Sequence, residues 1–328
     1  MAETLSVSDT WLLTDGKAGN LRQAQALADW LQRPAHAVTV SLSAPWRWLS
    51  PWAMRAPSNA LQPPMSPPWP ALAIGCGRIG AAALDALPDA NNGGPRRIQI
   101  LDPHIAPNRF DAVIVPEHDG LQGDNVITLT GSLHSVDAAW LQRQRQQQPE
   151  WADCDAPRTL LLLGGPRRGT GFGTREMCEL RRIVEHWQAR DAGCLWISLS
   201  GRTPAAWRRL VESFLPRLGA HRLWRGTEDG ANPYPGWLAH ADRIIVTPDS
   251  VNMLSEACAT GTPVLTHAPH GVRGRLGELH RSLREHGALR PLQLSVRSWR
   301  YAPLNEGPRA VEALRRLPAL RQLLPPTP

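Results

Sequence analysis

The chain is nearly free of lysine, because Lys17 is the single lysine among 36 basic residues. Arginine presents a planar, forked guanidinium, whereas lysine presents a compact ammonium on a flexible stem. A lone lysine in an arginine-rich chain therefore indicates a position where a compact cation is needed, although chance alone also accounts for one lysine. Lys17 is accordingly a candidate for neutralising charge in a functional site.

Several other features are absent, and each absence excludes a class of protein. No run of about 18 apolar residues occurs, so the sequence predicts no membrane-spanning helix. The first ten residues lack the basic start and apolar stretch of a secretory signal. The five cysteines are widely spaced and form no CxxC pair. This spacing indicates neither a disulfide framework nor a zinc site, and it favours the reducing cytoplasm.

The composition is that of a globular protein with an excess of positive charge. Apolar residues make up 42% of 328 residues, which allows a sizeable core and two domains. The net charge of +7 favours a phosphorylated ligand or the inner face of a membrane, but an arginine-rich proteome gives the same charge without a special partner. Nucleic acid is not expected as a partner, because the basic residues are scattered and lack interleaved aromatics.

Short apolar runs alternate with helical stretches, a pattern typical of parallel sheets covered by helices on both faces. The pattern restarts after a polar stretch at residues 142–157, which predicts domains at residues 1–150 and 151–328. We therefore expect an α/β protein of two doubly wound, Rossmann-like domains facing across a cleft. A last helix at residues 306–323 is a candidate to return to the first domain. Ligands of such sheets bind at the carboxyl ends of the strands.

The loop at residues 14–20 (TDGKAGN) leaves one expected strand and opens a helix. Glycines let a backbone approach a ligand, and the start of a helix offers free N–H groups. The spacing is not that of a Walker phosphate loop. Asp15, at the end of the strand, is a candidate general base, and a turn or capping aspartate is an equal alternative.

A second loop, residues 163–173 (LGGPRRGTGFG), also connects an expected strand to a helix. Glycines, arginines and a threonine together predict a cradle for an anion, with Gly164, Gly165, Arg168 and Thr170 as its members. A flexible surface turn has the same composition.

A third segment, residues 246–257 (VTPDSVNMLSEA), places a helix start directly after a strand. Backbone N–H groups at Ser250, Asn252 and Met253 suit a diphosphate, because the start of a helix carries partial positive charge. Glu256 lies within the same helix, where its carboxylate can accept hydrogen bonds from both hydroxyls of a ribose. The alternative is a simple capping pattern with Glu256 in solvent.

Two further segments have ambiguous interpretations. Residues 115–119 (VPEHD) place His118 directly after an expected strand. This position is typical of a general acid or base, and equally of an exposed polar turn. Residues 45–55 gather three tryptophans and two arginines, which suits the headgroup level of a membrane, although a short helix packed on the core is the preferred explanation. Neither residues 115–119 nor the similar segment at residues 102–104 has HExxH-type spacing, so we predict no metal site.

These motifs together resemble those of the mitochondrial fission ELM-type family. Bacterial members of that family are regarded as nucleoside-diphosphate-sugar glycosyltransferases, and the resemblance extends from about residue 11 to residue 308. It implies a GT-B fold with an N-terminal acceptor domain and a C-terminal donor domain. Pro248 departs from the pattern, because a small residue is expected there. The resemblance is carried by residues 14–20, 115–119, 232–236 (NPYPG) and 247–257.

In GT-B enzymes the helix containing the S-E-A stretch binds the phosphates and ribose of the donor. The resemblance implies that role for Ser250, Asn252, Met253, Ser255 and Glu256. We therefore expect a glycosyltransferase that uses a nucleoside-diphosphate sugar as donor, holds no tightly bound cofactor or metal and transfers to a saccharide or lipid-linked hydroxyl. A nucleotide-sugar epimerase and a non-catalytic scaffold that recruits partners, as plant relatives do, remain the alternatives.

Overall fold

The computed structural model describes residues 10–50 and 55–324, and the chain divides into two compact units. The first unit comprises Met1–Ser135 and Glu306–Pro328, and the second comprises Val136–Asn305. The boundary therefore lies at residue 135 and not at 150. The first part of the polar stretch that suggested a linker, residues 142–147, belongs to helix α4 (Ala138–Gln147), and a 3₁₀ turn (Pro149–Asp153) follows. Leu141 of α4 is buried, and its Arg145 Nε donates to the Ala239 carbonyl at 2.7 Å.

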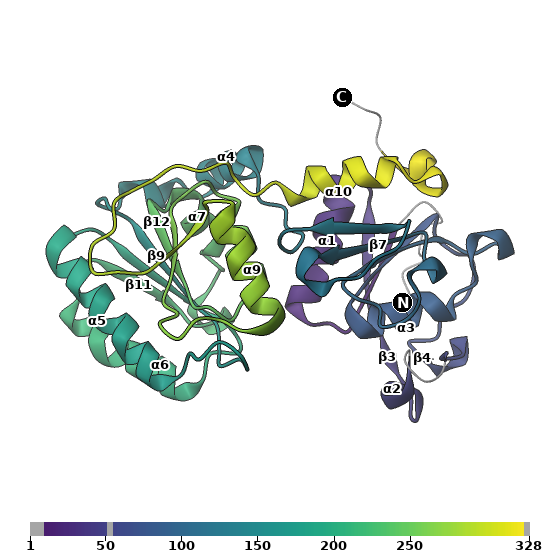
Figure 1. Ribbon diagram of the computed structural model, residues 1–328, viewed down its shortest axis with the longest axis horizontal. Coiled ribbons are helices and arrows are strands. Elements are labelled where there is room, and N and C mark those ends of the chain that lie inside the picture. The colour runs from purple at the N-terminus through teal and green to yellow at the C-terminus, as the bar shows by residue number, and fades with distance from the viewer. Residues whose placement is uncertain (1–9, 51–54, 325–328) are drawn as a thin grey trace. The chain divides into compact units, whose positions relative to one another are not determined.

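The first unit is built on a six-stranded, wholly parallel sheet with the order β2-β1-β5-β6-β7-β8 (Figure 1). Its strands are fully or partly buried apolar runs, as the sequence predicts. The run at residues 36–42 is divided between two strands, because Ser41 and Leu42 form β3, which pairs antiparallel with β4 (Leu61–Gln62). The strands are β1 (Thr10–Thr14), β2 (Ala35–Thr39), β5 (Leu72–Cys76), β6 (Arg96–Ile100), β7 (Ala112–Pro116) and β8 (Val126–Leu129).

Helices cover both faces of this sheet. One apolar cluster holds α1 (Ala18–Trp30) and α10 (Glu306–Arg315) against the sheet, and α3 (Gly77–Ala86) packs in the cluster on the other face. The returning helix α10 is fastened by Glu306, whose buried Oε2 accepts the Thr130 N–H at 3.0 Å. The expected helix at residues 306–323 ends at Arg315, and a 3₁₀ turn (Pro318–Leu323) follows because proline cannot continue an α-helix.

The second unit has a six-stranded parallel sheet with the order β11-β10-β9-β12-β13-β14. Apolar clusters fill both faces, with α4, α7, α8 and α9 on one side and α5 and α6 on the other. The strands are β9 (Thr159–Leu163), β10 (Leu195–Leu199), β11 (His221–Trp224), β12 (Arg243–Val246), β13 (Val264–Thr266) and β14 (Leu289–Pro291). The helices are α5 (Thr174–Asp191), α6 (Ala205–Phe214), α7 (Tyr234–His240), α8 (Val251–Cys258) and α9 (Gly274–Glu285).

Prolines stand at the start of two helices of the second unit. Residues 234–236 precede β12, as the sequence indicates, and they open helix α7, because Pro235 fits the first turn of a helix. Thr203 does not cap α6: Pro204 occupies the capping position, and the Thr203 hydroxyl contacts the carbonyls of Leu163 and Gly164 at 2.9 and 2.8 Å. Thr203 thereby joins the loops that follow β9 and β10.

The strand orders locate the place where each sheet can hold a ligand. The direction in which successive strands are added to the sheet reverses between β1 and β5 in the first unit and between β9 and β12 in the second. Doubly wound sheets bind ligands at such switch points, beyond the carboxyl ends of the strands. The loop at residues 14–20 follows β1, and the segments at residues 163–173 and 246–257 follow β9 and β12. The described residues contain no helix that is long and apolar enough to cross a membrane.

Candidate functional site

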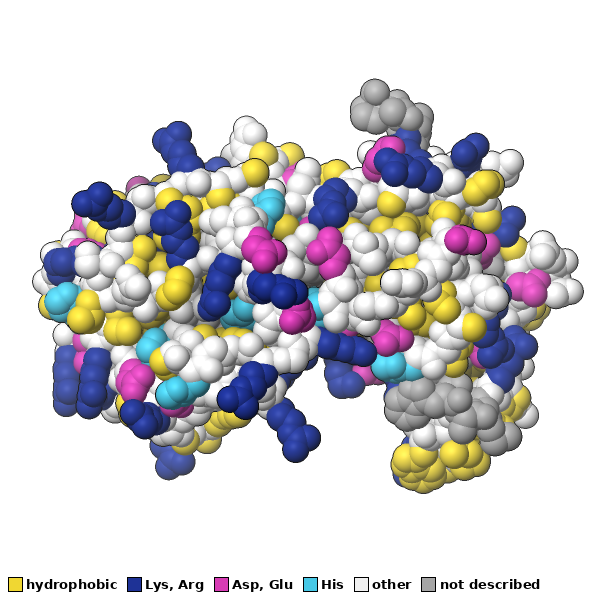
Figure 2. All heavy atoms as spheres, in the orientation of Figure 1, with side chains coloured by type: hydrophobic (Ala, Val, Ile, Leu, Met, Phe, Trp, Pro, Cys, Tyr) yellow, Lys and Arg dark blue, Asp and Glu magenta, His cyan; other side chains and the backbone are white. Residues whose placement is uncertain are grey.

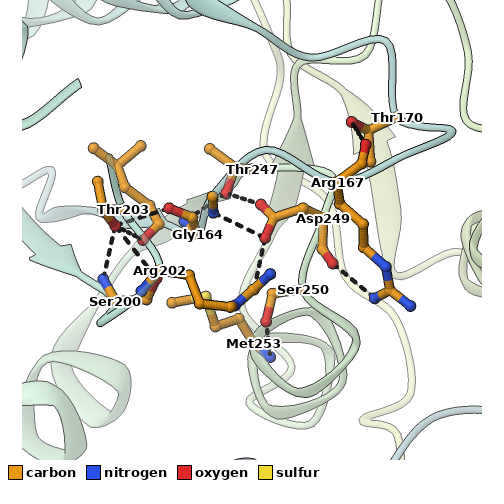
Figure 3. Close-up of polar contacts among 12 residues, drawn as sticks. Gly164, Arg167, Thr170, Ser200, Arg202, Thr203, Thr247, Asp249, Ser250 and Met253 are labelled. Carbon is orange, nitrogen blue, oxygen red and sulfur yellow. Dashed lines mark hydrogen bonds and ion pairs between the residues drawn. The ribbon is translucent and has the colours of Figure 1, made fainter. Parts of the chain in front are cut away.

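Asp249 is the centre of a hydrogen-bond network at the switch point of the second unit (Figure 3). Its side chain is 1% exposed, and its carboxylate accepts the Gly165 N–H at 3.0 Å, the Thr247 hydroxyl at 2.7 Å and the Arg202 guanidinium at 2.6 Å. Arg167 Nη1 donates to the Asp249 carbonyl at 3.0 Å. One carboxylate thus ties together the loops after β9, β10 and β12.

Gly164 and Gly165 are required by this close packing. A Cβ on Gly164 would lie 2.2 Å from Asp249 Oδ2, and a Cβ on Gly165 would lie 2.4 Å from the Arg202 carbonyl. Their N–H groups donate to the Thr247 hydroxyl, at 2.8 Å, and to Asp249. The amides that were expected to cradle an anion therefore donate to the protein's own side chains.

The other two members expected in this cradle have different environments. Thr170 is 1% exposed, and its hydroxyl donates to the Arg167 carbonyl at 2.8 Å and accepts the Phe172 N–H at 3.2 Å. It braces its own loop instead of facing a ligand. Arg168 is exposed and makes no ion pair or hydrogen bond within the described part of the chain, so its guanidinium is accessible to an anion.

Helix α8 begins at the carboxyl end of β12, as the third sequence segment predicts. Ser250 is its N-cap, and its hydroxyl accepts the Met253 N–H at 3.4 Å. Asn252 and Met253 are half-buried in the first turn. Ser255, expected to bind a ligand, is fully buried, and its hydroxyl donates to the Val251 carbonyl at 2.8 Å. Ser255 therefore supports the helix from within.

Glu256 is brought together with a motif that lies 22 residues earlier in the chain. Its side chain is 8% exposed, and its Oε2 accepts a hydrogen bond from the Tyr234 hydroxyl. Tyr234 is itself oriented by Asn232, whose side chain accepts the Tyr234 N–H at 3.0 Å. Glu256 is thus an oriented, largely desolvated carboxylate and not a solvated residue of a capping pattern.

Five arginines surround the carboxyl edge of this sheet, and only one of them was predicted. Arg202 is 51% exposed even though it pairs with Asp249. Two further exposed arginines stand at the start of α9: Arg273 is its N-cap and Arg275 lies in its first turn. The Arg273 N–H donates to the Gly169 carbonyl at 2.8 Å. Exposed guanidinium groups on neighbouring loops bind phosphate oxygens strongly. The five are Arg167, Arg168, Arg202, Arg273 and Arg275.

His280 of α9 supports the same turn from behind. Its Nε2 lies 2.9 Å from the carbonyl oxygen of Pro248, the residue that departs from the family pattern. The ring is 1% exposed, and burial lowers the pKa of His280 to about 4, an effect that Arg284 reinforces. The neutral ring can donate to Pro248 only with its proton on Nε2.

The titration of His280 makes the stability of the second unit dependent on pH. The pKa of His280 is lower in the folded than in the unfolded protein. The neutral ring therefore contributes fully to the free energy of unfolding above about pH 6.5, and this contribution is lost as the pH falls towards 4. We expect the unmodified protein to lose about 2 kcal/mol of stability through His280 between pH 7 and pH 5, and His280→Asn to lack this decrease. Urea denaturation of both proteins at the two pH values measures this difference. An equal pH dependence in the variant contradicts the assignment.

In the first unit, Asp15 and Lys17 form an ion pair in the loop after β1. Asn20 Nδ2 donates to Asp15 Oδ1 at 2.8 Å. Burial raises the pKa of Asp15, but the hydrogen bonds from Lys17 and Asn20 outweigh it and leave the pKa below its ordinary value. The carboxylate is therefore ionised at neutral pH but is a weak proton acceptor. Lys17 is 78% exposed, so its ammonium remains available to an anionic ligand.

His118 lies at the same edge of the first sheet but apart from Asp15. It belongs to the 3₁₀ turn Glu117–Asp119 after β7, and strands β5 and β6 separate β7 from β1. Three strand spacings amount to about 14 Å, so the two side chains cannot share a proton directly. Within the described part of the chain, no three histidine, cysteine or acidic side chains are grouped as metal ligands.

The family model described as mitochondrial fission ELM1 matches residues 18–317 of this chain. The chain belongs to that family. The mitochondrial fission protein ELM1 of Arabidopsis thaliana is 31% identical over 279 residues, which cover 77% of this chain. The match spans 65% of the length of that relative. Membership agrees with the motifs at residues 14–20, 115–119, 232–236 and 247–257.

Two solved structures show the class to which the fold belongs. The UDP-GlcNAc 2-epimerase of Methanocaldococcus jannaschii, solved with UDP-GlcNAc and UDP, superposes with a TM-score of 0.52 at 10% identity, covering 94% of this chain and 99% of that one. MnaA of S. aureus, solved with UDP, gives a TM-score of 0.51 at 12% identity, covering 96% and 89%. The family member described here therefore has the GT-B fold, with two Rossmann-like parallel sheets.

Proposed function

We propose that the protein is a glycosyltransferase whose second unit binds a nucleoside-diphosphate sugar at the amino end of α8. The observation that carries this proposal is the oriented, desolvated carboxylate of Glu256 on the same short helix that begins at the switch point. A diphosphate at the first turn of α8 places the attached ribose one to two turns further along the helix. The ribose hydroxyls then meet Glu256, which is a good acceptor for both.

The charge at this edge supports an anionic ligand. The first turn of a helix contributes about half a positive charge, and the exposed guanidinium groups of Arg168 and Arg202 add to it. Positive groups fixed before the reaction stabilise the diphosphate as it leaves with developing negative charge. The two solved GT-B proteins were crystallised with UDP, which makes a uridine nucleotide the first ligand to try.

For the first unit we propose the acceptor site, with Asp15 as the base that accepts the proton of the acceptor hydroxyl and His118 as the second candidate. Asp15 is ionised at neutral pH, which this role requires, although its hydrogen bonds lower its basicity. Lys17 supplies the compact positive charge beside it. The acceptor that we favour is a saccharide or a lipid-linked hydroxyl.

A thermal-shift screen with UDP, GDP, CMP and ADP and with their sugars tests the proposal. A ligand present at a hundred times its dissociation constant stabilises the folded protein by about 2.7 kcal/mol, which corresponds to a rise in Tm of roughly 5–10 °C. We expect one nucleotide class to give such a shift. A flat response to every nucleotide contradicts donor binding and favours the scaffold that recruits partners.

The epimerase alternative rests on the similarity to the Methanocaldococcus jannaschii protein. An epimerase isomerises its nucleotide sugar without an acceptor, whereas a transferase needs one. Incubation with the donor selected by the screen, followed by chromatography of the sugar, separates the two. We expect no isomer in the absence of an acceptor. Accumulation of an isomer would show that the protein is an epimerase and not a transferase.

A further inference from the structure

The short helix α2 (Trp46–Leu49) of the first unit presents aromatic and basic side chains to solvent. None of its residues is fully buried, and Trp48 is 58% exposed. Among the described residues, only Leu294 is a comparably exposed large hydrophobic side chain. The guanidinium of Arg47 stacks on the Trp48 ring at 4.0 Å from its centroid. Packing on the core accounts for the half-buried Trp46 but not for Trp48.

A largely apolar hollow lies beside this helix. It has a volume of about 730 Å³ and is lined by Trp46, Arg55, Pro57, Met65, Pro67 and Trp69, among others. Figure 2 shows hydrophobic side chains gathered at the α2 end of the first unit, at the lower right of the view. Tryptophan, proline and methionine around an open hollow form a surface that can bury apolar groups from outside the chain.

The charge of this surface is predominantly positive. Residues 30–84 contain no aspartate or glutamate, but they contain four arginines. Arg78 Nη1 donates to the carbonyls of Arg47 and Ser50 at 3.0 and 2.8 Å, which places a third guanidinium beside α2 and Arg55. The next carboxylate along the chain, Asp85, is 2% exposed and already pairs with Arg109 at 2.9 Å. Asp85 also lies 3.7 Å from Arg55 Nε, so this buried carboxylate offsets Arg55 but not the exposed Arg47.

We propose that α2 and the adjoining hollow, called here the α2 surface, dock on an anionic phospholipid membrane. Tryptophan partitions to the headgroup level, where its ring is apolar and its N–H is hydrated. Arg47 reaches lipid phosphates from the same position, and each basic residue near an anionic leaflet strengthens binding several-fold. A second copy of this chain is a poorer occupant, because two surfaces that both carry exposed arginines repel one another. The proposal is independent of the nucleotide site.

Co-sedimentation of the full-length protein with vesicles tests this surface. We expect binding to phosphatidylcholine vesicles that contain about 30% phosphatidylglycerol, and weak binding to phosphatidylcholine alone, because anionic lipids attract basic side chains. Trp48→Ala and Arg47→Glu should each weaken binding to the anionic vesicles about tenfold. Both residues are exposed, so these variants should keep the native circular dichroism spectrum and Tm.

Two matched variants of the second unit serve as controls. Leu294→Ala removes an equally exposed hydrophobic side chain, at 56% exposure, and Arg217→Glu makes the same charge reversal at another exposed arginine. Both should bind anionic vesicles as the unmodified protein does. Equal losses in the controls, or no binding to anionic vesicles, overturn the proposal. Concentration-dependent dimerisation that Trp48→Ala abolishes, without vesicle binding, would assign the α2 surface to a second copy instead.

Discussion

Replacing Glu256 with alanine is expected to weaken nucleotide binding by about tenfold to a hundredfold, because each hydrogen bond to a charged acceptor contributes about 1.5–3 kcal/mol. The carboxylate is held by Tyr234 and is 8% exposed, so little reorganisation precedes its contact with a ribose. Glu256→Gln should retain part of the affinity, because one amide oxygen can still accept a hydroxyl. Isothermal titration calorimetry with the nucleotide selected by the thermal-shift screen measures these losses.

The matched control for this series is Glu278→Gln on α9, an exposed glutamate of the same unit that pairs only with Arg281 among the described residues. It should leave the affinity unchanged. Tyr234→Phe keeps the ring and removes the hydrogen bond to Glu256, so it should produce an intermediate loss. Wild-type affinity in Glu256→Ala would show that this carboxylate does not meet the ligand.

Asp249→Ala is expected to destabilise the second unit by about 3–5 kcal/mol, because it leaves buried donors without an acceptor and removes the partner of a guanidinium. Gly165, Thr247 and Arg202 all donate to this carboxylate. Asp249→Asn should cost less stability, since its amide oxygen can still accept the Gly165 N–H. Urea denaturation followed by circular dichroism gives the free energy of unfolding of each variant.

Asp242→Ala is a control with a similar number of hydrogen bonds and much greater exposure. Asp242 accepts three hydrogen bonds from Arg158 but is 37% exposed, so its loss should cost about 1 kcal/mol. If the two alanine variants lose the same stability, burial of Asp249 at the junction of three loops does not have the effect that we assign to it.

The sequence specifies much of the fold because buried parallel strands are short apolar runs. The runs at residues 159–163 and 243–246, for example, become β9 and β12. The domain boundary was misplaced because most of α4 is glutamine and arginine, which resembles a linker. Its single buried residue, Leu141, is a weak sequence signal for a helix packed on the core. Helix α7 was missed because its two prolines resemble a loop, although both precede or occupy the first helical turn.

The candidate site was predicted less completely, since it depends on contacts between distant residues. Sequence patterns correctly place Ser250 at the start of a helix and Glu256 within it. They assign the amides of Gly164 and Gly165 to a ligand, because nothing local shows that Asp249, 84 residues later than Gly165, accepts from them. Arg202 was overlooked for the same reason, although its position directly after a buried strand was an available signal.

Donor binding at α8 can be observed in a crystal structure of the protein soaked with UDP. We expect the diphosphate within hydrogen-bonding distance of the first turn of α8, with the ribose hydroxyls on the Glu256 carboxylate. A nucleotide bound elsewhere in the chain, or one whose ribose faces away from Glu256, would show that α8 is not the donor site.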